Sequence, residues 1–282
     1  MKILIVGANG QVGSAAEQVL SNNERNEIVA LTRSDLDISN RSDVFNIVTS
    51  LVPDVVFNAA AMTNVDLCES ESELAFAINS FGVRNLAQAC ELVDSHLVHL
   101  STDFVFDGEI SRRYTEYDRT NPLSVYALSK LGGDEEALAY SKSTVLRVAW
   151  VFGNKKGDFF SWVLDGLNAG TLDSLIDDQI STPTYSYDVI SVLEKCITSR
   201  LFGLINVANE GETSRLEMGQ ILASKLGIDK KLSGITSDSL NRPAGRPNYS
   251  ALSTDLLSRL TGIKMRSWQD ALDEHLKRIA VK

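Results

Sequence analysis

The sequence predicts an α/β fold in which a doubly wound parallel sheet is followed by a smaller C-terminal α/β lobe. Apolar runs that suit strands alternate with segments long enough for a crossover helix. These runs are continuously apolar, as expected of strands that are covered on both faces. A turn with three glycines follows the first run, and the alternation loosens after about residue 152. These observations indicate a parallel sheet with helices on both faces and a second, smaller unit.

Each expected strand is a short apolar run that stops at a turn or a polar residue. A helix is expected before the fourth strand, because apolar residues from Ile78 to Val93 recur at helical spacing and Ser72 suits its start. In the second half the run LFGLINVAN is the clearest strand. The strands expected in the first half are residues 2–6, 27–32, 54–58, 96–101 and 144–148.

The composition bounds the class of protein. The chain has 282 residues, 44% of them apolar, and a formal net charge of −10. Such an acidic balance disfavours nucleic-acid partners, which need clustered Lys and Arg. Nowhere do about 18 apolar residues run together, so neither a membrane span nor a signal peptide is expected, and the protein is predicted to be cytoplasmic. Cys68, Cys90 and Cys196 are widely spaced, which favours reduced thiols over disulfides or a zinc site.

The first strand runs into GANGQVG, which places Gly7, Gly10 and Gly13 three residues apart. Glycine permits a close backbone approach, and the helix that follows offers free N–H groups and a positive dipole end to a diphosphate. The spacing is one residue longer than the usual dinucleotide fingerprint, but the turn opens the first βαβ unit, where that fingerprint belongs. A dinucleotide is therefore expected here, with Asn9, Gln11 and Val12 among its contacts. The alternative is a tight turn without a ligand.

The end of the second strand bears on the choice of cofactor. Where an acidic residue often binds the adenine ribose, this chain has Thr32 and Arg33. A guanidinium can accept a 2′-phosphate, which favours NADPH over NADH, although a solvated surface arginine is the alternative reading. Asp37 and its neighbour Ile38 suit the adenine end. Ala59, Ala60 and Ala61 follow the third strand and let a flat cofactor pass close to the backbone.

Tyr126 and Lys130 lie four residues apart in YALSK, on one face of an expected helix. A nearby ammonium favours the phenolate and is expected to lower the pKa of the tyrosine, which makes the pair a usable acid and base. The hydroxyl of Thr102, at the end of the fourth strand, supplies a second hydrogen bond to a substrate carbonyl while a nicotinamide delivers hydride. The alternative for the Tyr–Lys pair is a solvated amphipathic helix.

The glycine turn, the Ser-Thr strand end and YALSK together resemble the extended short-chain dehydrogenase/reductase family. GANGQVG, PDVVFNAAAMTNVDLCESE, LVHLSTDFVFDG, NPLSVYALSKLGGDE, VLRVAWVFGN and DQISTPTYSYDV are similar to its dTDP-4-dehydrorhamnose reductase branch. The resemblance implies a Rossmann domain over residues 1–152 and a mainly substrate-binding lobe over residues 153–282, with some chain returning to the first domain. It also implies reduction of the C4 ketone of a nucleotide-activated 4-keto-6-deoxy sugar with NADPH or, as a possibility, NADH.

By this resemblance Thr102 holds the carbonyl oxygen, Tyr126 donates the proton, and Lys130 tunes Tyr126 and binds the nicotinamide ribose. Asp103 and Trp150 match positions for sugar contacts, and Leu100 and Thr63 match positions near the cofactor. Arg242 and Arg246 either clamp the diphosphate, with Arg246 taken as a substrate residue, or form surface salt bridges.

Three further expectations follow. Phe104 stands where related dehydratases carry an acid, which disfavours dehydration. Some relatives share a metal between two subunits through a glutamate after the glycine turn; this chain has Ser14, Ala15 and Ala16, so no metal is expected. A homodimer is possible.

Alternatives to the reductase remain open. Similar chains serve as a non-catalytic regulatory subunit of methionine adenosyltransferase, and a reductase that forms another 6-deoxy sugar would carry the same motifs. Among the remaining polar residues, His96 and His99 are read as structural histidines and His275 as a surface residue. Asp134 is expected on an exposed helix face in contact with Lys130.

Overall fold

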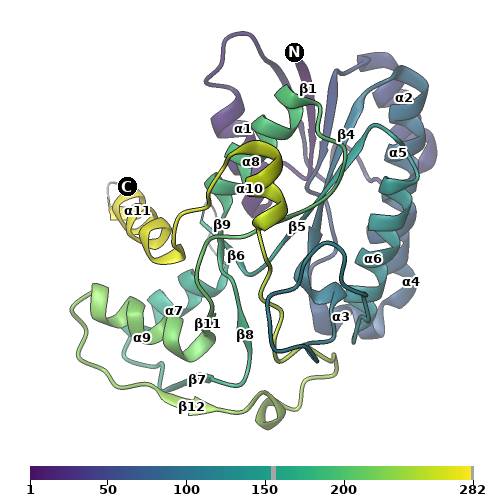
Figure 1. Ribbon diagram of the computed structural model, residues 1–282. Helices are drawn as coiled ribbons and strands as arrows, with labels where there is room; N and C mark the ends of the chain where they lie inside the picture. Colours follow the sequence, from purple (N-terminus) through teal and green to yellow (C-terminus); the bar gives the residue numbers. More distant parts are fainter. Residues whose placement is uncertain (154–156, 281–282) are drawn as a thin grey trace.

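The computed structural model describes residues 1–153 and 157–280 (Figure 1). Its centre is a six-stranded sheet in the order β10-β5-β4-β3-β1-β2, and every neighbouring pair is parallel. The strand order reverses between β1 and β3, which is where ligands bind in doubly wound sheets. The strands are β1 Lys2–Val6, β2 Glu27–Leu31, β3 Val55–Asn58, β4 His96–Thr102, β5 Ser143–Val148 and β10 Gly203–Val207.

The doubly wound α/β fold predicted from the sequence is confirmed, and the five strands expected in the first half agree within one residue at each end. The reason is visible in the burial of β1. Ile3 and Ile5 point into one apolar cluster, whereas Leu4 and Val6 point into the other. Because helices cover both faces, all four buried residues of the strand, Ile3 to Val6, are apolar.

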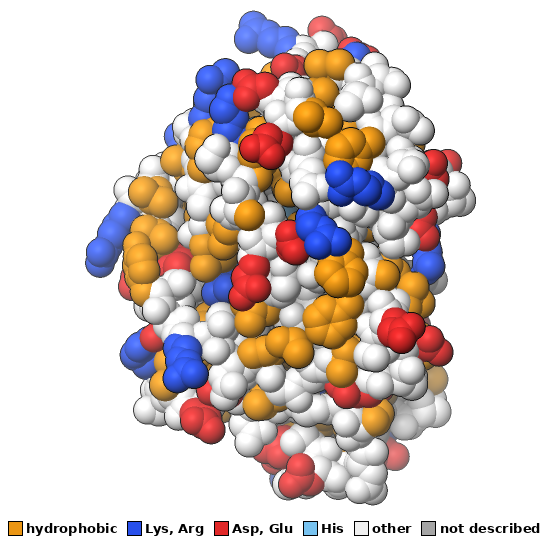
Figure 2. Space-filling view, turned by 90° about the vertical axis from the view of Figure 1, so that its right-hand side faces the viewer, with side chains coloured by type: hydrophobic (Ala, Val, Ile, Leu, Met, Phe, Trp, Pro, Cys, Tyr) orange, Lys and Arg blue, Asp and Glu red, His pale blue; other side chains and the backbone are white. Residues whose placement is uncertain are grey.

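Helices α1 Gln11–Leu20 and α8 Ser186–Ser199 pack on one face of the sheet, and α2 Arg41–Leu51, α5 Gly82–Val93 and α6 Val125–Leu138 on the other (Figure 1). Figure 2 shows the side of the molecule that carries the second group, where apolar side chains gather among charged ones. Exposed large apolar residues of α5 and α6 are Leu92, Leu128 and Leu138.

The helical segment expected from Ser72 onward is interrupted. It follows α3 Val65–Ser70 and consists of α4 Ser72–Phe76, a π-helical turn η1 at Ala77–Phe81, and α5. The π turn packs directly against α6, since a Cβ at Gly133 would lie 2.2 Å from the carbonyl oxygen of Asn79. The two glycines of KLGGDE therefore let α6 approach this turn closely.

The remaining chain crosses between the sheet and a smaller lobe several times (Figure 1). The lobe contains α7 Phe159–Asn168 and α9 Arg215–Lys225 with the strand pairs β7/β12 and β8/β11, while α8 and β10 return to the main sheet. The further elements are η2 Asp103–Val105, β6 Val151–Phe152, β7 Ser174–Ile176, β8 Ile180–Ser181, β9 Thr184–Tyr185, β11 Thr213–Ser214, β12 Ser233–Ile235, η3 Ser237–Leu240, α10 Asp255–Thr261 and α11 Trp268–Ala280.

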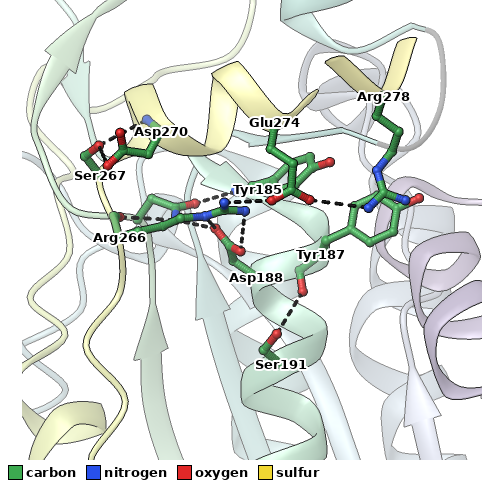
Figure 3. Close-up of polar contacts among 10 residues, drawn as sticks. Tyr185, Tyr187, Asp188, Ser191, Arg266, Ser267, Asp270, Glu274 and Arg278 are labelled. Carbon is green, nitrogen blue, oxygen red and sulfur yellow. Dashed lines mark hydrogen bonds and ion pairs between the residues drawn. The ribbon is translucent and has the colours of Figure 1, made fainter. Parts of the chain in front are cut away.

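A polar network fastens the start of α11 to the start of α8 (Figure 3). Arg266 donates to both carboxylate oxygens of Asp188, at 2.9 and 2.8 Å, and to Glu274 at 2.7 Å. On α11, His275 is buried and its ring contacts the rings of Phe152 and Tyr185. The expectation of a surface histidine is therefore wrong, because α11 turns this face toward the core. Among the described residues, no helix is long and apolar enough to cross a membrane.

Candidate active site

A cavity of about 680 Å³ opens at the carboxyl ends of β1, β3, β4 and β5, at the reversal of strand order. It brings together residues predicted from six separate parts of the sequence. Thr32 is not among the residues that line it, because its amide and hydroxyl donate to Asp35 at 2.9 and 2.7 Å. The predicted residues that line the cavity are Gly7, Asn9, Gly10, Gln11, Val12, Arg33, Asp37, Ile38, Ala59, Ala60, Ala61, Thr63, Leu100, Thr102, Asp103, Tyr126, Lys130 and Trp150.

The three glycines of the turn are needed for different reasons. Gly7 has φ +81°, and a Cβ there would lie 2.6 Å from the amide nitrogen of Ala60. A Cβ on Gly13 would lie 2.2 Å from the carbonyl oxygen of Gly7. A Cβ on Gly10 would meet only that same oxygen, at an ordinary 3.4 Å. Gly7 and Gly13 thus serve the packing of the turn, whereas Gly10 keeps space open at the start of α1.

At the other end of the cavity, Arg33 and Asp37 follow β2. Hydrogen bonds from Ser39, whose hydroxyl donates at 2.7 Å and whose amide donates at 2.9 Å, hold the pKa of Asp37 below its usual value, with Arg33 adding to the effect. Asp37 therefore remains ionised beside the guanidinium.

Thr102 ends β4 and caps the short helical turn η2. Its Oγ1 accepts from the amide of Phe104 at 3.2 Å and donates to Oδ1 of Asp103 at 3.2 Å. This pair of bonds fixes the hydroxyl at the strand's carboxyl end, where it faces the cavity.

Tyr126 and Lys130 lie in the first two turns of α6. Ser124 caps this helix by accepting from the amide of Ala127 at 3.2 Å, and Glu69 accepts from the amide of Val125 at 2.9 Å. The start of the helix is thereby fixed, and the four-residue spacing brings both side chains to the cavity.

Asn79, in the π turn, was not anticipated from the sequence, although it supports this helix. Its side chain accepts from the amide of Met62 at 2.8 Å and donates to the carbonyl of Met62 and to the hydroxyl of Ser129, both at 3.0 Å. Ser129 in turn donates to the carbonyl of Tyr126 at 2.8 Å. Asn79 thus links α6 to the loop after β3. No sequence signal marks it, because its direction depends on the π turn.

The pKa of Tyr126 differs in direction from the sequence prediction. Burial raises it above its usual value, and a hydrogen bond with Thr102 opposes this shift only in part. The ammonium of Lys130 donates instead to the carbonyl of Leu100, at 2.7 Å, and burial lowers the pKa of Lys130 to about 8. The prediction that Lys130 lowers the pKa of Tyr126 is therefore wrong, since burial and the nearby acidic groups, among them Asp103, set the direction of the shift.

Asp103 is only 2% exposed, and hydroxyls from the smaller lobe surround it. Its Oδ2 accepts from Ser181 of β8 at 3.1 Å and also from Ser250. Burial raises the pKa of Asp103 to about 6, although these hydroxyls and Thr102 favour the charged form. Neither serine was expected from the sequence, because each is an ordinary polar residue in a loop-rich segment.

Trp150 lines the same cavity in an unusual backbone conformation, with φ +43°. The guanidinium of Arg215 lies 3.5 Å from the centre of its ring and 4.4 Å from that of Phe159. Arg215 also lines a second cavity of about 580 Å³ in the smaller lobe, together with Phe104, Arg242 and Arg246. Trp150 lines the first cavity and Arg215 the second, so their stacked side chains lie at the border between the two cavities.

Three arginines gather in this second cavity. Arg246 donates to both oxygens of Asp66, at 3.0 and 2.8 Å. Burial lowers the pKa of Arg215 to about 9, and the charges of Arg242 and Arg246 add to the effect. The site is therefore suited to an anion.

Asp134 lies one turn beyond Lys130 but is 1% exposed, and its Oδ2 accepts from Nε of Arg147 at 3.0 Å. The expected exposed position is wrong, because α6 packs this face against β4 and β5. In the described part of the chain, no group of three or more His, Cys, Asp or Glu side chains is placed to hold a metal ion.

The family described as "RmlD substrate binding domain" matches residues 1–281. The chain belongs to this family. The resemblance to the dTDP-4-dehydrorhamnose reductases is thereby confirmed.

Members of the family are similar to this chain over nearly their whole length. A curated relative from Aggregatibacter actinomycetemcomitans, named dTDP-4-dehydrorhamnose reductase, is 36% identical, with 96% of this chain and 97% of the relative covered. A solved dTDP-4-dehydrorhamnose reductase from Clostridium acetobutylicum has a TM-score of 0.95 at 36% identity and covers 99% and 100% of the two chains. The Bacillus anthracis enzyme, solved in complex with NADP, has a TM-score of 0.94 at 31% identity and covers 98% and 99%.

Proposed function

We propose that this member of the family is an NADPH-dependent oxidoreductase that reduces the C4 ketone of a nucleotide-activated 4-keto-6-deoxy sugar. The reaction that its relatives' name indicates converts dTDP-4-dehydro-L-rhamnose to dTDP-L-rhamnose. The observation that carries the proposal is the meeting of Thr102, Tyr126 and Lys130 with the glycine turn in one cavity. A proton donor, a carbonyl ligand and a dinucleotide turn are the parts that such a reduction requires.

The residues present fit NADPH. The space over Gly10 and the start of α1 suits the diphosphate, and Arg33 suits a 2′-phosphate. Ala59, Ala60 and Ala61 leave room just after β3, and Lys130 is placed for the nicotinamide ribose. When bound, NADPH supplies the hydride that the ketone carbon receives.

Tyr126 supplies the proton. Its raised pKa keeps the phenol protonated at neutral pH, which a proton donor requires. The hydroxyl of Thr102, which donates to Asp103 in this structure, would turn to donate to the same carbonyl oxygen. The carbonyl carbon gains a hydride and its oxygen gains the phenol proton, so the product is an alcohol and Tyr126 is left as a phenolate.

The substrate is proposed to span both cavities. Asp103 and Trp150 border the cofactor cavity and are assigned to the sugar. Arg215, Arg242 and Arg246 repel one another, so the diphosphate of a nucleotide sugar would relieve this repulsion. Phe104 lines the second cavity and cannot transfer a proton, which favours simple reduction over dehydration.

This assignment divides the chain near residue 152, with cofactor binding before it and mainly substrate binding after it, while α8 and β10 return to the sheet. The three cysteines are buried free thiols, which suits the reducing cytoplasm that we propose as its location. The homodimer stays a prediction, which sedimentation velocity would test.

The direct test follows NADPH absorbance with a panel of dTDP-linked 4-keto-6-deoxy sugars and identifies the C4 configuration of each product by NMR. A protein that binds NADPH and reduces none of them would contradict the proposal. A product other than the rhamnose configuration would favour the alternative 6-deoxy-sugar reductase. Recovery of a methionine adenosyltransferase in a pull-down, without turnover, would favour the regulatory-subunit alternative.

Tyr126→Phe tests the proton donor. The variant should lose about 10²–10⁴-fold in turnover, because the ring remains but the proton is gone. The dissociation constant for NADPH should stay within about twofold, measured by fluorescence titration. Turnover equal to that of the unmodified protein would remove Tyr126 from the mechanism.

A further inference from the structure

His99 lies next to the proposed acid and base but outside the cavity. It is fully buried in β4, and its two ring nitrogens face two different partners. Nδ1 lies 3.1 Å from Nδ2 of Asn58, and Nε2 lies 3.3 Å from Nζ of Lys130. Burial lowers the pKa of His99 well below its usual value, and the charge of Lys130 adds to the effect, so the ring is neutral.

The hydrogen-bond partners of Asn58 decide which ring nitrogen carries the proton. Oδ1 of Asn58 accepts from the amide of Ala60 at 3.1 Å, which fixes the orientation of the side-chain amide. Its NH₂ group therefore faces Nδ1 of His99, and Nδ1 must accept. A neutral imidazole has one N–H, so that N–H is on Nε2 and points toward Lys130.

This arrangement acts on the charge of Lys130. An Nε2–H group cannot accept a hydrogen bond from an ammonium, but it can donate to the lone pair of an uncharged amine. The carbonyl of Leu100 accepts one Nζ–H at 2.7 Å in either state. The contact with His99 therefore favours the uncharged amine over the ammonium.

Other ionisable groups around Lys130 come from every element packed on α6. Asp134 favours the ammonium, but it is already paired with Arg147 of β5 at 3.0 Å. The π turn contributes only uncharged side chains. The remaining ionisable groups on neighbouring elements are Asp66, Cys68 and Glu69 of α3, Glu73 of α4, Arg84, Cys90 and Glu91 of α5, His96 of β4, Asp103 of η2, and Tyr126, Glu135 and Glu136 of α6 itself.

We propose that His99 is a positioning residue whose Nε2–H, aimed by Asn58, stabilises the uncharged amine of Lys130 and so helps Lys130 return a proton to Tyr126 after each reduction. In this step a proton leaves Nζ and reaches the phenolate oxygen of Tyr126. The lone pair left on Nζ accepts the Nε2–H hydrogen bond, and solvent water later returns a proton to Nζ. No electrons are transferred. The inference rests on the proposed function of Tyr126 and Lys130.

The first test is ¹⁵N NMR of the full chain labelled at histidine, which is practical because the chain has only three histidines. His96→Gln and His275→Gln assign the His99 signals by subtraction. The expected result is a neutral ring with the proton on Nε2. A proton on Nδ1, or on both nitrogens at neutral pH, would overturn the proposal.

The second test follows the Nε2 signal of His99 with pH. Because the two groups are coupled, the signal should shift where Lys130 loses its proton, and burial places the pKa of Lys130 at about 8. Lys130→Met should abolish this step while leaving the tautomer unchanged. A step that persists in Lys130→Met would show that it does not report Lys130, and the coupling would be refuted.

The third test uses Asn58→Asp to reverse the tautomer of the His99 ring. A carboxylate of the same shape can only accept, so it draws the ring proton to Nδ1 and turns Nε2 into an acceptor for the ammonium. The titration of Lys130 and the alkaline limb of kcat should both move up by about one pH unit, a tenfold change in proton affinity. No movement, or movement downward, would refute the role of His99. If the unmodified protein reduced no 4-keto sugar, the proposed function would be refuted, whereas the NMR results on His99 and Lys130 would still stand.

Discussion

At the scale of single residues, Asp103 is the clearest case of a carboxylate whose charged form is disfavoured by burial. The usual pKa of an aspartate is 3.8, and burial raises the pKa of Asp103 in the folded protein to about 6. Between these values the folded chain binds more protons than the unfolded chain, so this group's contribution to stability falls as pH rises from about 4 to about 6. Above that range the loss is constant.

Asp103→Asn should therefore gain stability relative to the unmodified protein as pH rises from 4 to 7, by on the order of 2–3 kcal/mol. Urea unfolding at both pH values measures the change. Asp107→Asn is the matched control, since hydrogen bonds led by the amide of Glu109 lower the pKa of Asp107. That contribution is present above the usual pKa of 3.8 and is lost as pH falls below it, so between pH 4 and 7 the control should change only slightly, and in the opposite direction. The same sign in both variants would contradict the assignment.

Arg33 tests the choice of cofactor. Arg33→Ala should raise the dissociation constant for NADPH about tenfold, equivalent to about 1.4 kcal/mol, because a charge-assisted contact to the 2′-phosphate is lost. NADH binding should be unchanged. Arg41→Ala is the control, since Arg41 stacks on Phe45 away from the cavity. Equal weakening of both cofactors in Arg33→Ala would remove Arg33 from the 2′-phosphate.

The sequence predicted most residues that line the cofactor cavity, because motifs at the ends of successive parallel strands meet at one edge of the sheet. It did not predict the charge states. Whether Lys130 lowers the pKa of Tyr126 depends on how deeply both are buried, and burial follows from packing that no local pattern records. Ser181 and Ser250 were missed for the same reason, since only the folded lobe brings them to Asp103.

At the scale of elements, different glycines of the turn between β1 and α1 serve packing and cofactor binding. Gly13→Ala would place a methyl group 2.2 Å from the carbonyl oxygen of Gly7, so a loss of about 1–3 kcal/mol in unfolding free energy is expected. Gly10→Ala meets no such contact and should change stability by at most a few tenths of a kcal/mol, while it weakens NADPH binding. Thermal unfolding and cofactor titration of the pair give the comparison. Equal loss of stability in both variants would contradict this division.

Strands and helix starts were predictable because their signals are local. Continuous apolar runs marked the five strands, and Ser72 marked the start of α4. The π turn was not predictable, since its extra residue is stabilised by contacts of Asn79 with Met62 and Ser129 rather than by propensity.

At the scale of the whole molecule, the second half of the chain was the least predictable part. The run at β10 was recognised as a strand, but its place beside β5 depends on long-range pairing. Asp134 and His275 were misplaced because their burial is set by the packing of α6 on the sheet and of α11 on β6 and β9. Crossings between the two parts of the chain are fixed by contacts between residues far apart in sequence.

The network in Figure 3 is such a contact, and it gives a test of how the C-terminal segment is held. Asp188 accepts from Arg266, which precedes α11, and from Asn209 after β10 at 2.6 Å. Asp188→Asn keeps the shape and removes the charge, so a loss of about 1–3 kcal/mol is expected. For a domain of this size this corresponds to roughly 2–4 °C in Tm for each kcal/mol.

Asp270→Asn provides the comparison within the same figure, because the bonds of Asp270 to residues that the structure describes are local, to Ser267 three residues before it, and Asp270 is exposed. Its loss should stay within about 0.5 kcal/mol. If Asp188→Asn instead matched this control, the carboxylate would not hold the start of α11 to α8. The start of α11 would then be held by the apolar packing of Trp268 and Leu272 and by the backbone hydrogen bonds that Glu210 makes with Arg266 and Trp268.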